Sequence, residues 1–135
     1  MPPSPEIHCG YRHKLDVLAA HCRSIGRDPA DIRKSLVVQA VVGRNQAALD
    51  DRLTRLGGSR GVSMEEMRGR AMVGTPEQCV DQLLAYVEAG VDDFIIGARA
   101  PVDYETLELV ATEIAPLVKD RGAELLTRRE GHASA

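Results

Sequence analysis

The most regular pattern of apolar and polar positions covers residues 73–96 and predicts a turn, a helix, a second turn and a strand. Thr75 and Gln78 form a Thr-x-x-Gln capping box, which marks the start of the helix. Apolar residues then recur at the spacing of one helix face, at Val80, Leu83, Leu84 and Val87. Gly90 suits the left-handed position after a helix, and the apolar run at 94–96 has the size of a buried strand. These signals predict one helix–strand unit of an α/β protein.

Similar patterns elsewhere predict a second strand and further helices. Residues 13–25 predict a helix that stops at Gly26. Its apolar face carries Leu15, Leu18, Cys22 and Ile25. The run SLVVQAVV at 35–42 has no polar alternation, which is typical of a parallel strand covered on both faces. Asn45 is a good N-cap for the next helix, and a second capping box at 63–66 opens a short helix.

The end of the chain predicts one more helix and then a flexible segment. Asp103 introduces the helix, and Pro116 should kink or end it because proline removes a helical hydrogen bond. The element order predicts two parallel strands joined by a right-handed crossover. We therefore expect a loose lead-in over residues 1–12, an α/β domain over 13–119 and a flexible tail over 120–135.

Several of these segments resemble one protein family. VGTPEQ at 73–78, AGVDDFII at 89–96 and IAPLV at 114–118 follow one another as in the C-terminal part of the luciferase-like monooxygenases. KLDVLAAHCRSIGRDPADI at 14–32 is similar to the penultimate helix of those proteins and the turn after it. The family comprises flavin- or deazaflavin (F420)-dependent oxidoreductases built on a TIM barrel. The resemblance covers roughly residues 13–119 and is spread over many positions.

The resemblance implies a partial TIM (β/α)₈ barrel made of about its last two strand–helix units, with two parallel strands. A complete barrel needs about 250 residues, whereas this chain has 135. Under the resemblance, residues 35–42 correspond to the seventh barrel strand and residues 91–96 to the eighth. The catalytic machinery of the family lies mostly before this region. We therefore predict no catalytic residue and expect a truncated form that is inactive alone.

In TIM barrels the chemistry takes place at the C-terminal ends of the strands. The resemblance places Gly43 and Arg44 at a substrate mouth, and Gly97 and Arg99 where FMN or F420 would bind. Arg99 could contact a phosphate or an acidic substrate group through its guanidinium. The alternative is a surface arginine in a loop, since neither a general base nor a Gly-rich phosphate loop accompanies it. We expect the isolated chain to bind neither cofactor tightly, because most of the mouth is absent.

Composition and charge exclude several function classes. The net charge is −3, and the chain has one Phe, three Tyr and no Trp, so no basic stripe or base-stacking platform for nucleic acid is evident. No apolar run approaches the ~20 residues of a membrane span. Three cysteines, an odd number, argue against a disulfide framework and favour a cytoplasmic location.

Other candidate side chains have simpler structural interpretations. Metal-competent atoms gather near the N-terminus, at His8, Cys9, His13, His21 and Cys22. Their spacing lacks the two matched pairs of zinc sites, so we predict no metal site and place Cys22 in the core. Cys79 lies in the first turns of a helix, where a thiol pKa can be lowered. No histidine is near it in sequence, and we assign it to helix packing.

Two functions remain open. The chain could act within a larger flavin- or F420-binding oxidoreductase assembly, or it could be a non-catalytic α/β domain that associates with itself or with a partner. In either case the side chains of residues 35–42 project to both faces of their strand. Helices from this chain can cover only one of those faces. We therefore expect a homo-oligomer, or a partner chain that covers the sheet.

Overall fold

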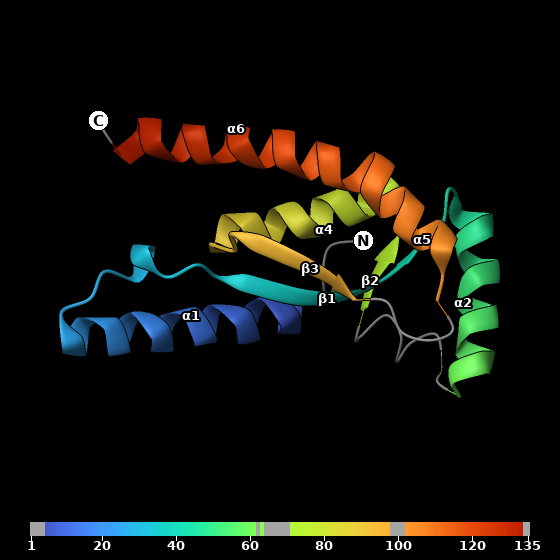
Figure 1. The fold of residues 1–135 in the computed structure, drawn as a ribbon, viewed down its shortest axis with the longest axis horizontal. Coiled ribbons are helices and arrows are strands. Elements are labelled where there is room, and N and C mark those ends of the chain that lie inside the picture. Colours follow the sequence, from blue (N-terminus) through green and yellow to red (C-terminus); the bar gives the residue numbers. More distant parts are fainter. Residues whose placement is uncertain (1–4, 62, 64–70, 98–101, 134–135) are drawn as a thin grey trace.

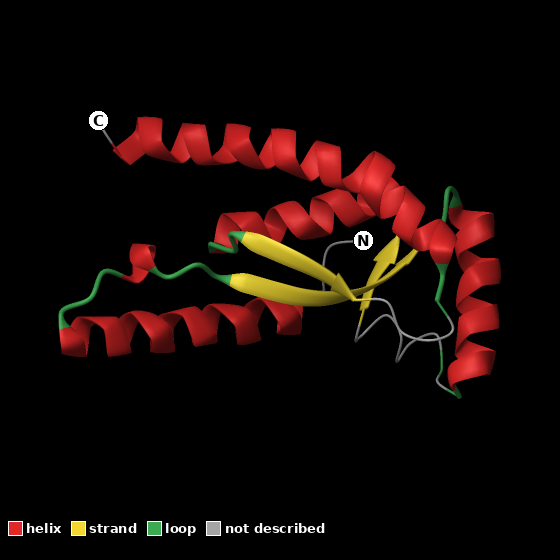
Figure 2. Ribbon diagram, viewed as in Figure 1, coloured by secondary structure: helices red, strands yellow, loops and turns green. Residues whose placement is uncertain are grey.

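Three parallel strands form the centre of an α/β fold, and the first strand of the chain lies in the middle of their sheet (Figures 1 and 2). The computed structural model describes residues 5–61, 63, 71–97 and 102–133. The strands are β1 (Ser35–Val42), β2 (Ala71–Gly74) and β3 (Asp93–Gly97), in the sheet order β2-β1-β3. The helices are α1 (Pro5–Ile25), α2 (Gln46–Arg60), α4 (Pro76–Ala89), α5 (Tyr104–Leu109) and α6 (Ala115–Ala133).

β1 pairs with its two neighbours along different parts of its length. The part up to Gln39 pairs with β3, and the part from Gln39 onward pairs with β2. Gln39 is thus the register partner of both Gly97 and Ala71. β3 therefore ends level with the middle of β1, whereas β2 ends level with the end of β1.

β2 is a strand that the sequence pattern did not predict, so the expected two strands are corrected to three. The pattern placed Val73 and Gly74 in the turn before α4 and predicted no element for Ala71 and Met72. Four residues are too few to show a period, and pairing with β1 decides their conformation. The short helix predicted at 63–66 lies, apart from Ser63, outside the described residues.

Helices pack on both faces of the sheet, but to different extents. One face carries Val38, Ala40 and Val42 and packs under α4, α5 and α6. The opposite face carries Val41 and Val73 and packs against α2 at one end of the sheet (Figure 1). The path of the chain reverses direction and changes face between its two crossovers, as in doubly wound sheets. In a barrel, by contrast, successive strands lie side by side in chain order.

The helix–strand unit at residues 73–96 forms as the pattern predicted. Thr75 is the N-cap of α4, and its N–H donates to Gln78 Oε1 at 3.0 Å. Gly90 ends the helix with a left-handed φ of 112°. Asn45 caps α2 in a similar way, since its side chain accepts the N–H of Ala48 at 2.9 Å. Local capping signals in the sequence therefore located these helix ends correctly.

Both ends of the chain are more helical than predicted. α1 begins at Pro5, inside the segment expected to be a loose lead-in. Proline is tolerated in the first turn of a helix, so its presence there did not exclude one. α6 continues to Ala133 through the expected flexible tail, where AELLTRRE is rich in strong helix formers.

Pro116 does not end the last helix. A π-helical turn, Val110–Ile114, joins α5 to α6 directly before it. The N–H of Ala115 donates to the carbonyl oxygen of Val110, five residues earlier. The wider turn accommodates the proline ring and its missing N–H, so α5, the π turn and α6 form one continuous helical segment.

α1 is attached to the rest of the fold by few contacts. Tyr11 packs edge-to-face on Tyr86 of α4, with ring centroids 5.8 Å apart. Cys22 is buried, as predicted, whereas Ile25 of the same expected apolar face is largely exposed. The expected apolar face of α1 is therefore only partly buried against the rest of this chain.

Candidate functional site

One buried arginine holds the carboxyl end of β1. Arg52 of α2 is 5% exposed, and its guanidinium donates to the Val42 carbonyl oxygen at 2.8 Å. The same guanidinium pairs with Glu105, and its Nε lies 3.4 Å from Asp103 Oδ2. Arg52 thus joins α2, the end of β1 and the start of α5, and two carboxylates balance its charge.

Thr106 completes this group, which we call the Arg52 cluster: Arg52, Asp103, Glu105 and Thr106. The Thr106 hydroxyl donates to Asp103 Oδ2 at 2.6 Å and accepts the N–H of Val42 at 3.0 Å. Asp103 Oδ1 accepts the N–H of Thr106 at 3.2 Å as the N-cap of α5. The polar groups of the cluster are paired with one another. The cluster therefore fastens α2 and α5 to the sheet.

The residues predicted at a substrate mouth follow β1 directly. Gly43 is buried, and a Cβ atom there would lie 2.4 Å from the backbone nitrogen of Leu49. Close packing of this turn against α2 therefore requires glycine. The Arg44 side chain is 59% exposed, and its Nε lies 3.6 Å from Glu105 Oε1. Gly43 thus serves packing, and Arg44 joins the Arg52 cluster at the surface.

Gly97, predicted to contact a cofactor, lies at the end of β3 but not level with Gly43. Its register partner Gln39 precedes Gly43 by four residues, which is about 13 Å along a parallel strand. A Cβ atom at Gly97 would lie 2.4 Å from Gln39 Nε2, so the glutamine amide covers this glycine. Arg99, its predicted companion, lies outside the described residues. The staggered sheet therefore separates the two predicted mouth positions.

One face of the sheet is open near its centre. Val37 of β1 and Ile95 of β3 are register partners, and they are 65% and 53% exposed. We call this open region the bare face, and its residues are Ser35, Val37, Gln39, Asp93, Ile95 and Gly97. The expectation that helices of this chain leave one sheet face uncovered is confirmed for this region.

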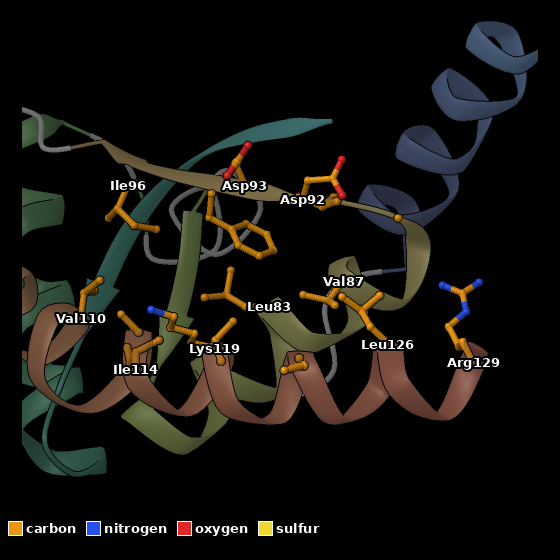
Figure 3. A pocket seen from close by; sticks show the side chains of 17 residues that line it. Leu83, Val87, Asp92, Asp93, Ile96, Val110, Ile114, Lys119, Leu126 and Arg129 are labelled. Atoms are coloured by element: carbon orange, nitrogen blue, oxygen red, sulfur yellow. The ribbon is translucent and has the colours of Figure 1, made fainter. Parts of the chain in front are cut away.

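A groove of about 570 Å³ lies between β3, α4 and α6 (Figure 3). Most of its lining is apolar. The apolar residues that line it include Leu83, Val87, Phe94, Ile96, Ile114, Val118 and Leu126. Figure 3 shows Asp92 and Asp93 on the β3 side of the groove, and Lys119 and Arg129 on the α6 side. The groove thus combines an apolar interior with a few charged groups, which is the usual composition of a small-molecule site.

Both aspartates beside the groove have partners within the chain. The guanidinium of Arg33 donates to Asp93 Oδ2 at 2.7 Å, and this hydrogen bond lowers the pKa of the Asp93 carboxyl. Asp92 Oδ2 accepts the backbone N–H of Lys34 at 2.9 Å. These contacts fix the segment before β1 to the start of β3. The carboxylates of Asp92 and Asp93 are therefore already engaged by groups of this chain.

Cys79 has the packing role that the sequence predicted. Its side chain is fully buried in the core under α4, and burial raises the pKa of its thiol to about 12. A thiol with such a pKa stays protonated at neutral pH and is a poor nucleophile. Among the described residues, no three His, Cys, Asp or Glu side chains lie close enough together to hold a metal ion.

Sequence reasoning missed both the Arg52 cluster and the groove. A signal for the cluster exists, because Arg52 lies three residues after Leu49 and four before Leu56, on the apolar stripe of α2. A charged residue at such a position indicates a buried ion pair. The groove has no comparable local signal, because its lining comes from elements far apart in the sequence, β3, α4 and α6.

No helix in the described part of the chain is both long enough and apolar enough to cross a bilayer. A scan of protein-family models, a search of curated proteins and a search of solved structures found no match to this chain.

Proposed function

We propose that this protein is a non-catalytic, self-associating α/β domain in which a second copy covers the bare face. The observation that carries the proposal is the adjacent pair Val37 and Ile95, both more than half exposed in the middle of a parallel sheet. Parallel sheets are normally covered on both faces. Exposed apolar side chains at such a position are typical of an interface.

A second copy fits the bare face because the face is complementary to itself. In such a dimer the bare faces of the two copies stack on each other. The two-fold axis lies in the plane between them, perpendicular to the strands and level with Val37 and Ile95. It would stack these side chains on their counterparts. It would also place Asp93 over the partner's Gly97, which keeps the two Asp93 carboxylates apart. Arg33 already neutralises Asp93 within each copy.

The available apolar contact predicts a dimer of low affinity. Full burial of a Val or Ile side chain contributes about 1.5–3 kcal/mol, and these side chains are partly covered already. Four of them across a dimer contribute several kcal/mol, against the entropy lost on association. Because that entropy cost removes much of this contribution, we expect weak association, with a dissociation constant between about 10 μM and 1 mM.

Sedimentation equilibrium of the purified chain across this concentration range tests the proposal. The wild type should pass from monomer to dimer, and Val37→Lys should remain monomeric because it places a charge in the interface. Val17→Lys on α1 is the matched control, since Val17 is also partly exposed but lies outside the bare face. A wild-type monomer at all concentrations, or equal effects of the two variants, would contradict the proposal.

We further propose that the domain descends from the C-terminal part of a luciferase-like, flavin- or F420-dependent oxidoreductase, that is, from the last strand–helix units of a TIM barrel, and that it resides in the cytoplasm. The α4–Gly90–β3 unit, formed by the stretch that resembles this family, favours such a parentage. The unpaired, buried Cys22 and Cys79 fit a reducing compartment. Flavin or deazaflavin absorbance in the protein as purified would favour the redox assembly over the non-catalytic domain.

A further inference from the structure

The groove between β3, α4 and α6 has the size and lining of a ligand site that the proposed self-association does not use. Its volume of about 570 Å³ lies within the range of pockets for small molecules. Its interior is formed by side chains that the core already holds in place, including Leu83 and Ile114. The bare face carries Val37 and Ile95, and neither residue lines the groove. The apolar parts of the two surfaces are therefore separate, and the residue that the surfaces share is Asp93.

Small residues of α6 keep the groove open. Gly122 lines it, and a Cβ atom there would lie no closer than 3.8 Å to the methyl groups of Val87. This distance is an ordinary van der Waals contact, so core packing does not require glycine at this position. Glycine inside a helix costs about 0.5–1 kcal/mol relative to alanine. The space beside Gly122 is thus not demanded by the fold.

The charges around the groove leave one cation unpaired. Both aspartates are engaged near the start of β3, as described above, and Arg129 donates to the carbonyl oxygen of Glu88 at 2.9 Å. Lys119 makes no hydrogen bond or ion pair within the described part of the chain. Figure 3 shows its side chain extending from α6 over the apolar lining near Ile114 and Leu83. An ammonium group beside an apolar groove favours a ligand that supplies an anion next to an apolar body.

We propose that this groove binds a small amphipathic carboxylate, with an unbranched apolar chain along the lining and its carboxylate paired with Lys119. The apolar chain would occupy the space beside Gly122, between α6 and the Phe94 side of β3. The carboxylate would provide the charge partner that Lys119 lacks. A cationic or neutral headgroup would leave the ammonium unpaired or repel it.

Calorimetric titration of the full chain with decanoate, decanol and decyltrimethylammonium tests the headgroup assignment. Decanoate should bind with one site per chain and at least about tenfold more tightly than either of the other two. Lys119→Glu should weaken decanoate binding at least about tenfold. Lys14→Glu, the same charge reversal at an exposed position on α1, should leave it unchanged. Equal weakening by the two variants, or no preference for decanoate, would overturn the proposal.

Gly122→Leu tests the location of the apolar chain. The added side chain should fill the groove and weaken decanoate binding at least about tenfold, while the melting temperature stays equal or rises. Unchanged decanoate binding by this variant would place the ligand elsewhere. Loss of dimerisation in Gly122→Leu would show that a second copy occupies the groove, and would also overturn the proposal. Val37→Lys should bind decanoate like the wild type, whether or not the chain self-associates.

Discussion

The two faces of the sheet are formed by alternate residues of the same strands, yet the chain covers them very differently. Val42 is fully buried under α4 and α5, whereas Val37, five residues earlier on the opposite face, is mostly exposed. Three helices pack on the first face. On the second face α2 reaches only the end of the sheet, where Val41 and Val73 lie.

The difference shows that β1 alone does not determine how it is covered. Its run of apolar residues is suited to burial on both faces. The described residues supply one complete helical layer, and the Arg52 cluster holds α2 at the end of the other face. An apolar strand with only one complete layer leaves a surface that another polypeptide can cover.

Removing the Arg52 side chain should extend the bare face to the end of the sheet. Arg52→Leu leaves the largely buried Asp103 carboxylate without its cation, and such losses cost about 3–5 kcal/mol. Denaturant unfolding should show this decrease in the free energy of unfolding. Arg44→Leu is the control, since Arg44 is exposed and its longer contact with Glu105 contributes less than about 1 kcal/mol. Equal decreases in the free energy of unfolding for the two substitutions would contradict the structural role assigned to the cluster.

The same substitution on each face of β1 compares the two faces directly. Val42→Ala removes two fully buried methyl groups and should lower the free energy of unfolding by about 2 kcal/mol. Val37→Ala removes mostly exposed methyl groups and should change it by less than about 0.5 kcal/mol in the monomer. Measurement below the dimer dissociation constant separates folding from association. A Val37→Ala effect as large as that of Val42→Ala would mean that the bare face is covered.

Alkaline pH should weaken the covered layer through Cys79. Burial raises the pKa of this thiol from about 9 in the unfolded chain to about 12 in the fold. As the pH rises, the Cys79 thiol therefore loses its proton in the unfolded state before it does so in the folded state. The free energy of unfolding is unaffected below pH 9, and between pH 9 and the folded-state pKa it should fall by about 1.4 kcal/mol per pH unit. Cys79→Ala lacks this thiol, so its free energy of unfolding, measured by denaturant titration, should fall less steeply as the pH is raised. Parallel declines in the two proteins would contradict the assignment.

The isolated chain should show no response to FMN. The polar groups at the end of β1 are paired within the Arg52 cluster, and Gly97 lies under Gln39. Titration of FMN with the protein should therefore leave the flavin fluorescence unchanged at micromolar concentrations. A dissociation constant of 1 μM, about −8 kcal/mol, would show that the strand ends form a cofactor site despite their stagger.

Local signals in the sequence predicted the elements well where each element carries its own cap and period. The ends of α4 depend on short-range hydrogen bonds and backbone conformation at Thr75, Gln78 and Gly90. The folded chain makes the same local interactions that the sequence pattern predicts. β2 was missed because its four residues become a strand only by pairing with β1. Of the two outcomes expected at Pro116, a kink or the end of the helix, the end does not occur there, because a π turn before it absorbs the missing hydrogen bond.

The site was harder to predict because it depends on register and helix angles. Gly43 and Gly97 both follow apolar runs, which gave no indication that β3 stops level with Gln39. The bare face followed correctly from the excess of apolar side chains over available helices. Lys119, which is unpaired among the described residues, and Gly122 lie on one helix, but they form part of a groove only because that helix lies opposite β3.

The position of β1 in the sheet has a consequence for synthesis of the chain. The middle strand is the first to leave the ribosome, since β1 ends at residue 42, whereas β3 ends at residue 97, 55 residues later. At about 5–20 residues per second, β1 waits roughly 3–11 s before its second neighbour has been made. During that time an apolar strand has at least one unpaired edge. The rate of translation therefore sets how long this strand is open to pairing with the wrong chain.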